Sequence, residues 1–421
     1  MEDLEELVKK AAMKADQAEI FYLVKTSTSF RGIADKINFS RSSFSKGYAL
    51  RVIKDGKMGV SYFYNPSEFD RALNTAIYAS RFAEKLGIQF PLKKAFTEVK
   101  GVYDKKLLKK DENELSDCIV QMIDTVKRKG AMPIRCGAGR NESFFCMLNS
   151  EGGEFKSKRT GFSAHSTARF KDTAQTSDKS SHSFFNPVEL AEKSADLALA
   201  FAEGKPTSGE FDIVIPPTLV ANFLRLEPFA SFSGEKAFRK DSYFSGKKGK
   251  KVADDQLNVY DDPTIPNGMG SVKCDDEGVA ANRKALIRNG ILNILLYNLE
   301  TARRAKTKTT GSGFRNSVSH PLGSGPTNLV ITSKNITHLD DFKGIMVNSL
   351  IAMQNLNQRN GNFSCSIASG AFFNGEIGKP IKGCSLVGNF FDILKNVSLA
   401  DDEQVYHKYY GPSWTFRGKI V

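Results

Sequence analysis

Several motifs that identify common enzyme classes are missing from this sequence of 421 residues. It contains no His-Glu-x-x-His, Gly-x-Ser-x-Gly or Walker phosphate-loop motif, so these three routes to hydrolysis are not indicated. No run of 18 apolar residues exists, and no segment is therefore expected to span a membrane. The first residues, MEDLEELVKK, are acidic and amphipathic, unlike a secretory signal peptide. We expect a cytoplasmic protein.

Cysteine and histidine are also scarce. The six cysteines form no Cys-x-x-Cys pair, which excludes a zinc ribbon and a thioredoxin-type motif. In a reducing cytosol we expect them to be buried thiols rather than disulfides. No two of the five histidines are close enough to share a helix face, so no local metal site is indicated: His165, His182, His320, His338 and His407.

Basic residues exceed acidic residues, and the net charge of +13 permits contact with nucleic acid. The densest basic runs, at 156–159, 245–251 and 303–308, lack the interleaved aromatics of a single-strand binding platform. A solvated, lysine-rich surface is the preferred interpretation. Most of the five adjacent acid pairs lie beside turn residues, and Asx turns explain them without a catalytic role. The pairs are Asp254-Asp255, Asp261-Asp262, Asp275-Asp276, Asp340-Asp341 and Asp401-Asp402.

The N-terminal half alternates helical and strand patterns. Apolar spacing predicts helices over 3–16, 65–84, 111–130 and 186–203, a strand over 19–25, a hairpin over 48–64 around Asp55-Gly56, and four or more short strands within 132–185. Both 65–84 and 186–203 begin with Asn-Pro-x-Glu and end with Phe-Ala-Glu, which indicates two related helix–strands–helix units, 1–100 and 101–205. The alternative is two independent helices that use the same favourable cap.

The pattern of the sequence changes after a Gly/Pro/Ser-rich linker at 204–210. Asn-Gly pairs at 289–290 and 374–375, each flanked by apolar runs, predict hairpins. Helices are expected over 217–232, 298–305 and 338–354, and the Gly/Ser-rich stretch 311–328 is interpreted as a long mobile loop. The predicted fold class is therefore α+β. Antiparallel strands flanked by helices form an N-terminal domain (1–205), and a largely antiparallel β domain with a few helices follows (206–421).

Four segments resemble one known family. They are GYALRVIKDGKMGVSYFYN (47–65), CDDEGVAANRKALIRNGILNILLYNLETARRAKTKTTGSG (274–313), GNFSCSIASGAFFNGEIGKPIKGCSLVGNFFDILKNV (361–397) and YYGPSWTFRG (409–418). The pattern resembles the TldD/PmbA family of metallopeptidases, also known as modulators of DNA gyrase. The likeness runs nearly end to end and is most specific between 275 and 418.

This family has two branches. The TldD branch carries His-Glu-x-x-x-His on a helix and a Cys ligand near the C-terminus, whereas the TldE (PmbA) branch lacks them and pairs with TldD. Anchored on Ser-Gly-Glu at 233–235, the two His positions fall on Arg225 and Ala230, and the Glu position falls on Leu226. None of these side chains can ligate zinc, which binds imidazole, thiolate or carboxylate. Pro228 would also bend the same turn.

The resemblance implies a subunit without metal or cofactor, in a cytoplasmic heteromer whose zinc lies in a TldD-type partner. Such a complex would cleave peptides or unfolded chains, and this chain would be inactive alone. The residues expected to contact substrate or partner are Asn362, Phe363, Ser364, Cys365 and Ser366, with Thr309, Gly311 and Arg315. Their alternative role is ordinary hairpin packing.

Three other functions stay open at this point. The chain could be a self-sufficient peptidase with an unseen site, a basic nucleic-acid-binding regulator, or a homo-oligomer that needs no TldD-type partner.

Overall fold

The computed structural model describes residues 2–225, 232–357, 359–402 and 404–421. In its N-terminal half the elements are α1 (Glu2–Ala12), β1 (Gln17–Ile33), β2 (Lys36–Lys54), β3 (Lys57–Phe63), α2 (Phe69–Ser80), α3 (Lys105–Leu108), α4 (Glu112–Arg128), β4 (Met132–Asn149), β5 (Glu154–Phe170), β6 (Thr173–Ser181) and α5 (Val188–Ala200). The α+β fold class is confirmed. The region 132–185 was expected to hold four or more short strands, but it holds three long ones, because continuous alternation carries each strand across the whole sheet.

One six-stranded antiparallel sheet contains all six N-terminal strands, in the order β3-β2-β1-β4-β5-β6. Each half of this sheet is a three-strand meander that follows one helix (α1 or α4) and precedes another (α2 or α5). β1 and β4 lie side by side at the centre, so the two halves are arranged symmetrically. The predicted turn chemistry is present, since Asp55 and Gly56 have φ values of 53° and 73°, and Asn65 and Glu68 form a capping box.

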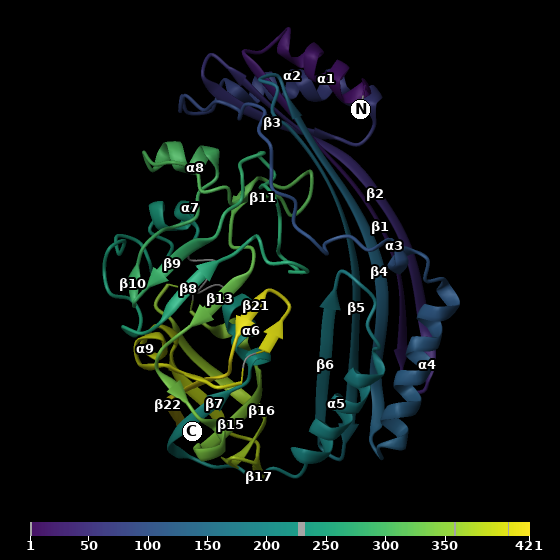
Figure 1. Ribbon diagram of the computed structural model, residues 1–421, viewed down its shortest axis with the longest axis vertical. Coiled ribbons are helices and arrows are strands. Elements are labelled where there is room, and N and C mark those ends of the chain that lie inside the picture. Colours follow the sequence, from purple (N-terminus) through teal and green to yellow (C-terminus); the bar gives the residue numbers. More distant parts are fainter. Residues whose placement is uncertain (1, 226–231, 358, 403) are drawn as a thin grey trace.

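The helices cover one face of this sheet. Ile20 and Leu50 pack under α1 and α2, while Phe162 and Ala164 pack under α4 and α5. Because strand side chains alternate between faces, the odd-numbered residues of β1, such as Phe21, point to the opposite face. Figure 1 shows that the sheet is long and curved and that the C-terminal lobe sits within its concave side.

The C-terminal lobe consists of β7 (Gly209–Ile215), α6 (Pro217–Arg225), α7 (Gly234–Phe238), β8 (Asn258–Asp261), β9 (Lys284–Arg288), β10 (Ile291–Leu292), α8 (Leu299–Arg304), β11 (Gly313–Phe314), β12 (Gly323–Ser324), β13 (Leu329–Thr332), β14 (Ile336–Thr337), β15 (Lys343–Ile351), β16 (Asn362–Asn374), β17 (Ile377–Ile381), β18 (Ser385–Asn389), α9 (Phe390–Asn396), β19 (Ser398–Ala400), β20 (Gln404–Tyr406), β21 (Tyr409–Gly411) and β22 (Trp414–Ile420). The hairpins β9–β10 and β16–β17 confirm the two Asn-Gly predictions. The helix at 298–305 is present as α8, but the one at 338–354 is wrong. That stretch holds β15, whose apolar residues pair with β16 in an extended conformation.

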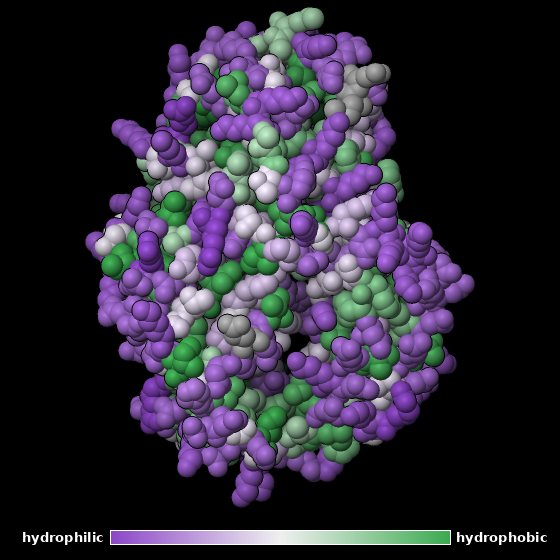
Figure 2. All heavy atoms as spheres, viewed as in Figure 1, coloured by the Kyte–Doolittle hydropathy of each residue, from purple (hydrophilic) through white to green (hydrophobic). Residues whose placement is uncertain are grey.

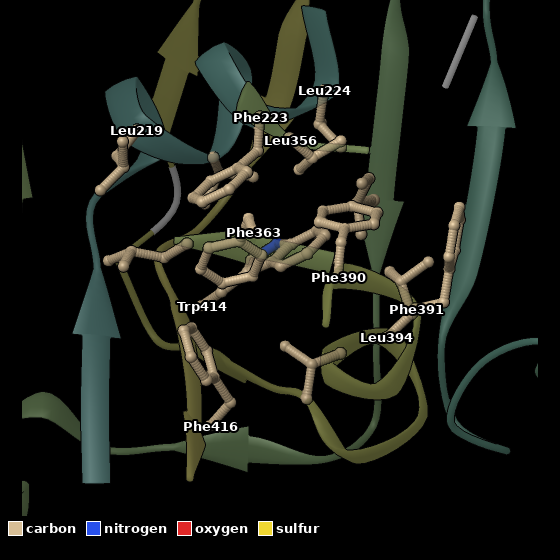
Figure 3. Close-up of a cluster of buried hydrophobic side chains, with 14 of the residues drawn as sticks. Leu219, Phe223, Leu224, Leu356, Phe363, Phe390, Phe391, Leu394, Trp414 and Phe416 are labelled. Atoms are coloured by element: carbon tan, nitrogen blue, oxygen red, sulfur yellow. The ribbon is translucent and has the colours of Figure 1, made fainter. Parts of the chain in front are cut away.

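The strands of this lobe form two main layers. One sheet has the order β10-β9-β8-β13-β21-β20. In the other, β7 pairs with both β15 and β22, so that β7, β15, β16, β18 and β22 close into a ring. Figure 3 shows the core next to this ring, where Phe223 of α6 and Phe390 of α9 approach Trp414 and Phe363. No helix among the described residues is both long and apolar enough to cross a membrane.

Candidate functional site

Of the positions that the sequence predicts to align with the metal motif, the one that the structure describes lies at the end of α6. Arg225 is the last residue of this helix, whereas Leu226 and Ala230, with Pro228, lie outside the described residues. The preceding turn of α6 packs in the hydrophobic core, since the Phe223 ring lies 5.4 Å from the Phe363 ring and Leu224 is buried. The described part of α6 thus supplies core side chains and no metal ligand.

A zinc ion does not fit the described residues. Within those ranges, no three His, Cys, Asp or Glu side chains are grouped so that they could hold a metal. The acids that do gather, around Asp275 and Glu277, accept hydrogen bonds from arginine or from backbone N–H groups instead. The coordination chemistry of the metallopeptidases therefore cannot be assigned to these residues.

The predicted contact strand, 362–366, is the first part of β16, and on its β15 side only Ser366 is paired, with Ile351. Its backbone pairs with β18 in antiparallel register, from Asn362–Asn389 to Ser366–Ser385. Phe363 and Cys365 point into the core, and burial raises the pKa of the Cys365 thiol. Asn362, Ser364 and Ser366 are exposed on the other face. Only these three side chains are free to reach a ligand.

The second predicted contact segment, which includes Thr309, Gly311 and Arg315, is built into the fold. The Thr309 hydroxyl donates to the Tyr297 carbonyl at 3.1 Å. Gly311 has a φ of 62°, and a Cβ there would lie 2.5 Å from the Ala280 carbonyl oxygen. The stretch 311–328, expected to be a long mobile loop, is irregular apart from the short β11–β12 pair, and Arg315 anchors it between the two lobes.

A buried ionic cluster, formed by Glu19, Arg51, Asp276, Glu277 and Arg315, connects the lobes. Arg51 binds Glu19 through Nε at 2.9 Å and through Nη2 at 2.7 Å, and its Nη1 donates to Glu277 Oε1 at 2.5 Å. Arg315 Nη2 reaches Glu19 Oε1 at 3.4 Å, and its backbone N–H donates to Asp276 Oδ2 at 2.7 Å. The side chains of Glu19, Arg51, Glu277 and Arg315 are at most 3% exposed.

The electrostatics of this cluster follow from burial. Burial tends to lower the pKa of Arg51, but Glu19 and Glu277 outweigh it and raise that pKa. Burial and the neighbouring Arg51 lower the pKa of Arg315. Burial raises the pKa of Asp276 to about 6, even though Arg315 opposes the shift. The arrangement is a structural clamp, and nothing in it is placed as a nucleophile or base toward an open site.

The Asx turn that the sequence predicts at Asp275 accounts for only part of the contacts of this carboxylate. Asp275 does form a local Asx-type turn, since its Oδ1 accepts from the backbone N–H groups of Glu277 and Val279 at 3.1 and 2.9 Å. Its Oδ2, however, accepts from the Gly313 N–H, which is 38 residues away. The small and apolar residues that follow Glu277 could have indicated that these acids are buried. Their partners Arg51 and Arg315 are too distant in sequence to be recognised from the local pattern.

A second polar region lies further along the concave face of the N-terminal sheet. At its β6 edge, Asp178 Oδ1 accepts from the Tyr406 hydroxyl at 2.5 Å, and Asp178 Oδ2 lies 2.7 Å from His407 Nε2. Two more contacts bind β6 and its preceding turn to the C-terminal lobe, namely Gln175 with Asn348 at 3.0 Å and Asp172 with Lys382 at 3.0 Å. These contacts close one side of a space between the lobes.

Figure 2 shows an opening in the surface beside β6, between the curved sheet and the C-terminal lobe. Comparison with Figure 1 places it between β6 and the hairpin of β20 and β21. Lys408, within this hairpin, reaches solvent although protein surrounds it on most sides; that burial, followed by Arg159, lowers its pKa. The lobes therefore enclose a water-accessible space with cations on both of its walls.

Comparison with known proteins agrees with this fold. Residues 208–420 match the PmbA/TldA metallopeptidase C-terminal domain, and residues 18–80 match PmbA/TldA metallopeptidase domain 1. These matches define the protein as one with the metallopeptidase-type fold. The chain belongs to the PmbA/TldD family, which confirms the resemblance found in the sequence.

Among curated relatives, an uncharacterized protein of Methanocaldococcus jannaschii is 28% identical over 422 residues, which cover 100% of each chain. A metalloprotease of the same organism is 30% identical over 218 residues, which cover 50% of this chain and 48% of that relative. The "Metalloprotease TldD homolog" of Haemophilus influenzae is 30% identical over 175 residues, covering 39% of this chain and 35% of its own.

Two solved structures share the complete fold. A Thermotoga maritima protein described as a modulator of a DNA gyrase has a TM-score of 0.89 at 21% identity and covers 99% of this chain and 100% of its own. TldE from Thermococcus kodakarensis has a TM-score of 0.88 at 20% identity and covers 100% of both chains.

Proposed function

We propose that this chain is the TldE-type, non-metal-binding subunit of a two-protein zinc metallopeptidase that cleaves peptides or unfolded chains. In this proposal the metal and the catalytic base belong to a TldD-type partner. This chain contributes a wall of the chamber that holds the peptide. It hydrolyses nothing by itself, and its own residues bind and orient.

The observation that carries the proposal is the set of residue types at the metal-motif positions. Arg225, Leu226 and Ala230 offer a guanidinium, an isobutyl group and a methyl group. A guanidinium stays protonated at any physiological pH and cannot coordinate a cation, and the other two groups have no donor atom. No His or Cys occurs between residues 216 and 260, and no Cys follows Cys384, so a slip of the alignment does not restore the site.

The enclosed space beside β6 supports the binding role. The contacts from Asp178 and Gln175 hold the C-terminal lobe against the edge of the curved sheet, and the space between them is accessible to solvent. In this proposal an extended chain enters the space and a folded domain does not. The segment 362–366 pairs with β18 along one edge, and we assign its exposed Asn362, Ser364 and Ser366 side chains to ligand or partner contact.

The test is to mix the purified chain with the His-Glu-x-x-x-His homologue of its organism. We expect the two proteins to co-elute and peptide hydrolysis to appear only in the mixture. Glu→Gln in the motif of the partner should abolish hydrolysis, whereas Leu226→Gln, the aligned change in this chain, should leave it unchanged.

Three outcomes would overturn the proposal. Stoichiometric zinc with hydrolysis by the isolated chain would make it a self-sufficient peptidase. A homo-oligomer that excludes the partner would make it a self-contained assembly. Tight, steeply salt-dependent binding of nucleic acid without any complex would make it a basic regulator.

A further inference from the structure

The concave face of the N-terminal sheet carries a cation in almost every row of paired residues. The strand registers place the following residues side by side across the sheet: Ser45, Lys25, Ser143 and Arg159; Ser43, Ser27, Asn141 and Gly161; Arg41, Ser29, Gly139, Ser163 and Ser180; Phe39, Arg31, Gly137, His165 and Asp178; Arg135, Thr167 and Thr176. We name the cations Lys25, Arg31, Arg41, Arg135 and Arg159 on this surface the basic face. Asp178 is the one acid in these rows.

The basic face is the side of the sheet that looks toward the C-terminal lobe. Phe21 and Met147, which have the same parity as Lys25 and Ser143, pack on Cys274 and Val318 of that lobe. Further along the same face, Asp178 contacts His407. The rows between these contacts therefore border the enclosed space.

The basic face is only partly neutralised within the protein, because Asp276 acts on Arg159 and opposes the burial that lowers the Arg159 pKa. In the ranges that the structure describes, none of the five forms an ion pair with a carboxylate, whereas exposed cations elsewhere do, such as Lys129 with Asp196 at 2.9 Å. The positive charges of this face also affect the pKa of His165. Burial, then Arg135 and Arg31, lower its pKa, and Asp178 only partly opposes them.

The opposite wall adds to this potential. Lys408, in the turn between β20 and β21, lies close enough to Arg159 that burial, then Arg159, lower its pKa, while Asp261 opposes the shift. These two like charges repel each other, and an anion bound nearby would relieve part of that repulsion.

The floor between the cations is small and polar. Gly137, Gly139 and Gly161 lie in the central rows, and the ring of His165 lies against Gly137 so closely that a Cβ there would overlap it. Serines fill most of the remaining positions. Such a floor allows a polypeptide backbone to approach and offers it hydrogen-bond partners. It lacks the row of exposed aromatics on which the bases of single-stranded nucleic acid stack, since Phe39 is the one aromatic in these rows and Arg31 covers it at 5.8 Å.

We propose that the basic face binds an extended, acidic stretch of polypeptide in the space between the lobes. Successive rows are two residues apart along a strand, which is about 7 Å, the same spacing as alternate side chains of an extended peptide. Carboxylates at every second position would therefore lie in step with these rows, four of which carry a cation, while the row of Ser43, Ser27, Asn141 and Gly161 carries none. This inference rests on the proposed peptidase role and gives it a substrate class.

The experiment measures binding by the complete chain alone, with fluorescent twelve-residue peptides in which Ser alternates with Glu, Gln or Lys. We expect the Glu peptide to bind at least about tenfold more tightly than the Gln peptide, and the Lys peptide to show no binding. The triple change Lys25→Gln, Arg31→Gln and Arg135→Gln should remove about tenfold of the affinity for the Glu peptide.

Two control variants distinguish specific binding at the basic face from nonspecific electrostatic attraction to the whole chain. The matched triple change Lys94→Gln, Lys105→Gln and Lys127→Gln removes the same charge from exposed positions elsewhere and should alter binding by less than about twofold. Ser163→Glu, an exposed position in the middle of the basic face, should weaken binding although it removes no cation. Both variants keep the buried core intact, so folding is checked by an unchanged melting temperature.

Equal binding of the Glu and Gln peptides, equal losses in the two triple variants, or tighter binding of single-stranded DNA than of the Glu peptide would overturn the inference. The outcome is separable from that of the proposed function. If the mixture with the partner hydrolyses peptides without preference for acidic ones and the triple variant is fully active, the peptidase role holds and the basic face is not the substrate site. Binding of the Glu peptide without hydrolysis in any mixture supports the site and contradicts the peptidase role.

Discussion

Arg51 Nη1 lies 2.5 Å from Glu277 Oε1, although 226 positions separate the two residues in the chain. Both side chains are at most 3% exposed, and they come from different lobes. A buried charge pair of this kind is costly to break, because the surviving partner is left without compensation in a poorly solvated site. The pair therefore ties the orientation of the C-terminal lobe to the stability of the chain.

Glu277→Ala should lower the free energy of unfolding by about 3–5 kcal/mol, because Arg51 loses one of its two buried carboxylates and the Leu299 N–H loses its acceptor. The measurement is urea denaturation followed by circular dichroism. Glu154→Ala, which removes an exposed ion pair with Lys93, should cost no more than about 1 kcal/mol. Equal effects of the two changes would contradict the structural role of the cluster.

Asp276→Asn should change how stability depends on pH. The folded-state pKa of Asp276 is raised to about 6, so this carboxyl binds its proton more tightly in the folded chain than in the unfolded chain. It therefore adds stability at low pH, and that contribution is lost as the pH rises from about 4 through about 6. Relative to the wild type, Asp276→Asn should gain about 2–3 kcal/mol between pH 4 and 7.

The check is to measure the free energy of unfolding of both proteins at intervals across that range. Other titrating groups are shared by the two chains and cancel in the difference. A difference that does not vary with pH, or that falls as the pH rises, would show that Asp276 is ionised throughout.

Gly290→Ala should be more damaging than Gly246→Ala. Both glycines have positive φ, 72° and 67°, so an L-residue costs about 1–2 kcal/mol at either position. At Gly290, a Cβ would additionally lie 2.6 Å from the carbonyl oxygens of Ala253 and Asp254, whereas nothing lies within 4 Å at Gly246. We expect the extra cost to be about 1–3 kcal/mol in thermal or chemical unfolding. Indistinguishable losses would mean that the β9–β10 turn relaxes away from the clash.

The thiols should be inert until the chain unfolds. All six cysteines are buried, and burial raises the pKa of the Cys136, Cys146 and Cys274 thiols, which lowers the fraction of reactive thiolate. A chromogenic thiol reagent at pH 8 should titrate no cysteine rapidly in the native protein and six in denaturant. One fast-reacting cysteine under native conditions would contradict this burial.

Local patterns predicted those elements in which the deciding interactions are close in sequence. The Asp55-Gly56 and Asn289-Gly290 turns, the Asn65–Glu68 cap and the amphipathic helices were accessible because residues within a few positions determine them. The stretch 338–354 failed because its apolar residues suit either a helix or a buried strand, and only pairing with β16 decides between them. The anchors of segment 311–328, Glu19 and Asp276, could not be predicted because they are remote in the chain.

The sequence by itself determined the family and the chemistry that the motif positions lack, since Arg225, Leu226 and Ala230 offer no metal donor in any conformation. The fold class also followed from it. Only the tertiary structure decided where the charges lie. Lys25, Arg135 and Arg159 share one face because strand register aligns residues far apart in the chain, and Arg51 meets Glu277 because the lobes dock. Electrostatic energy depends on distance in space, and sequence separation does not report that distance.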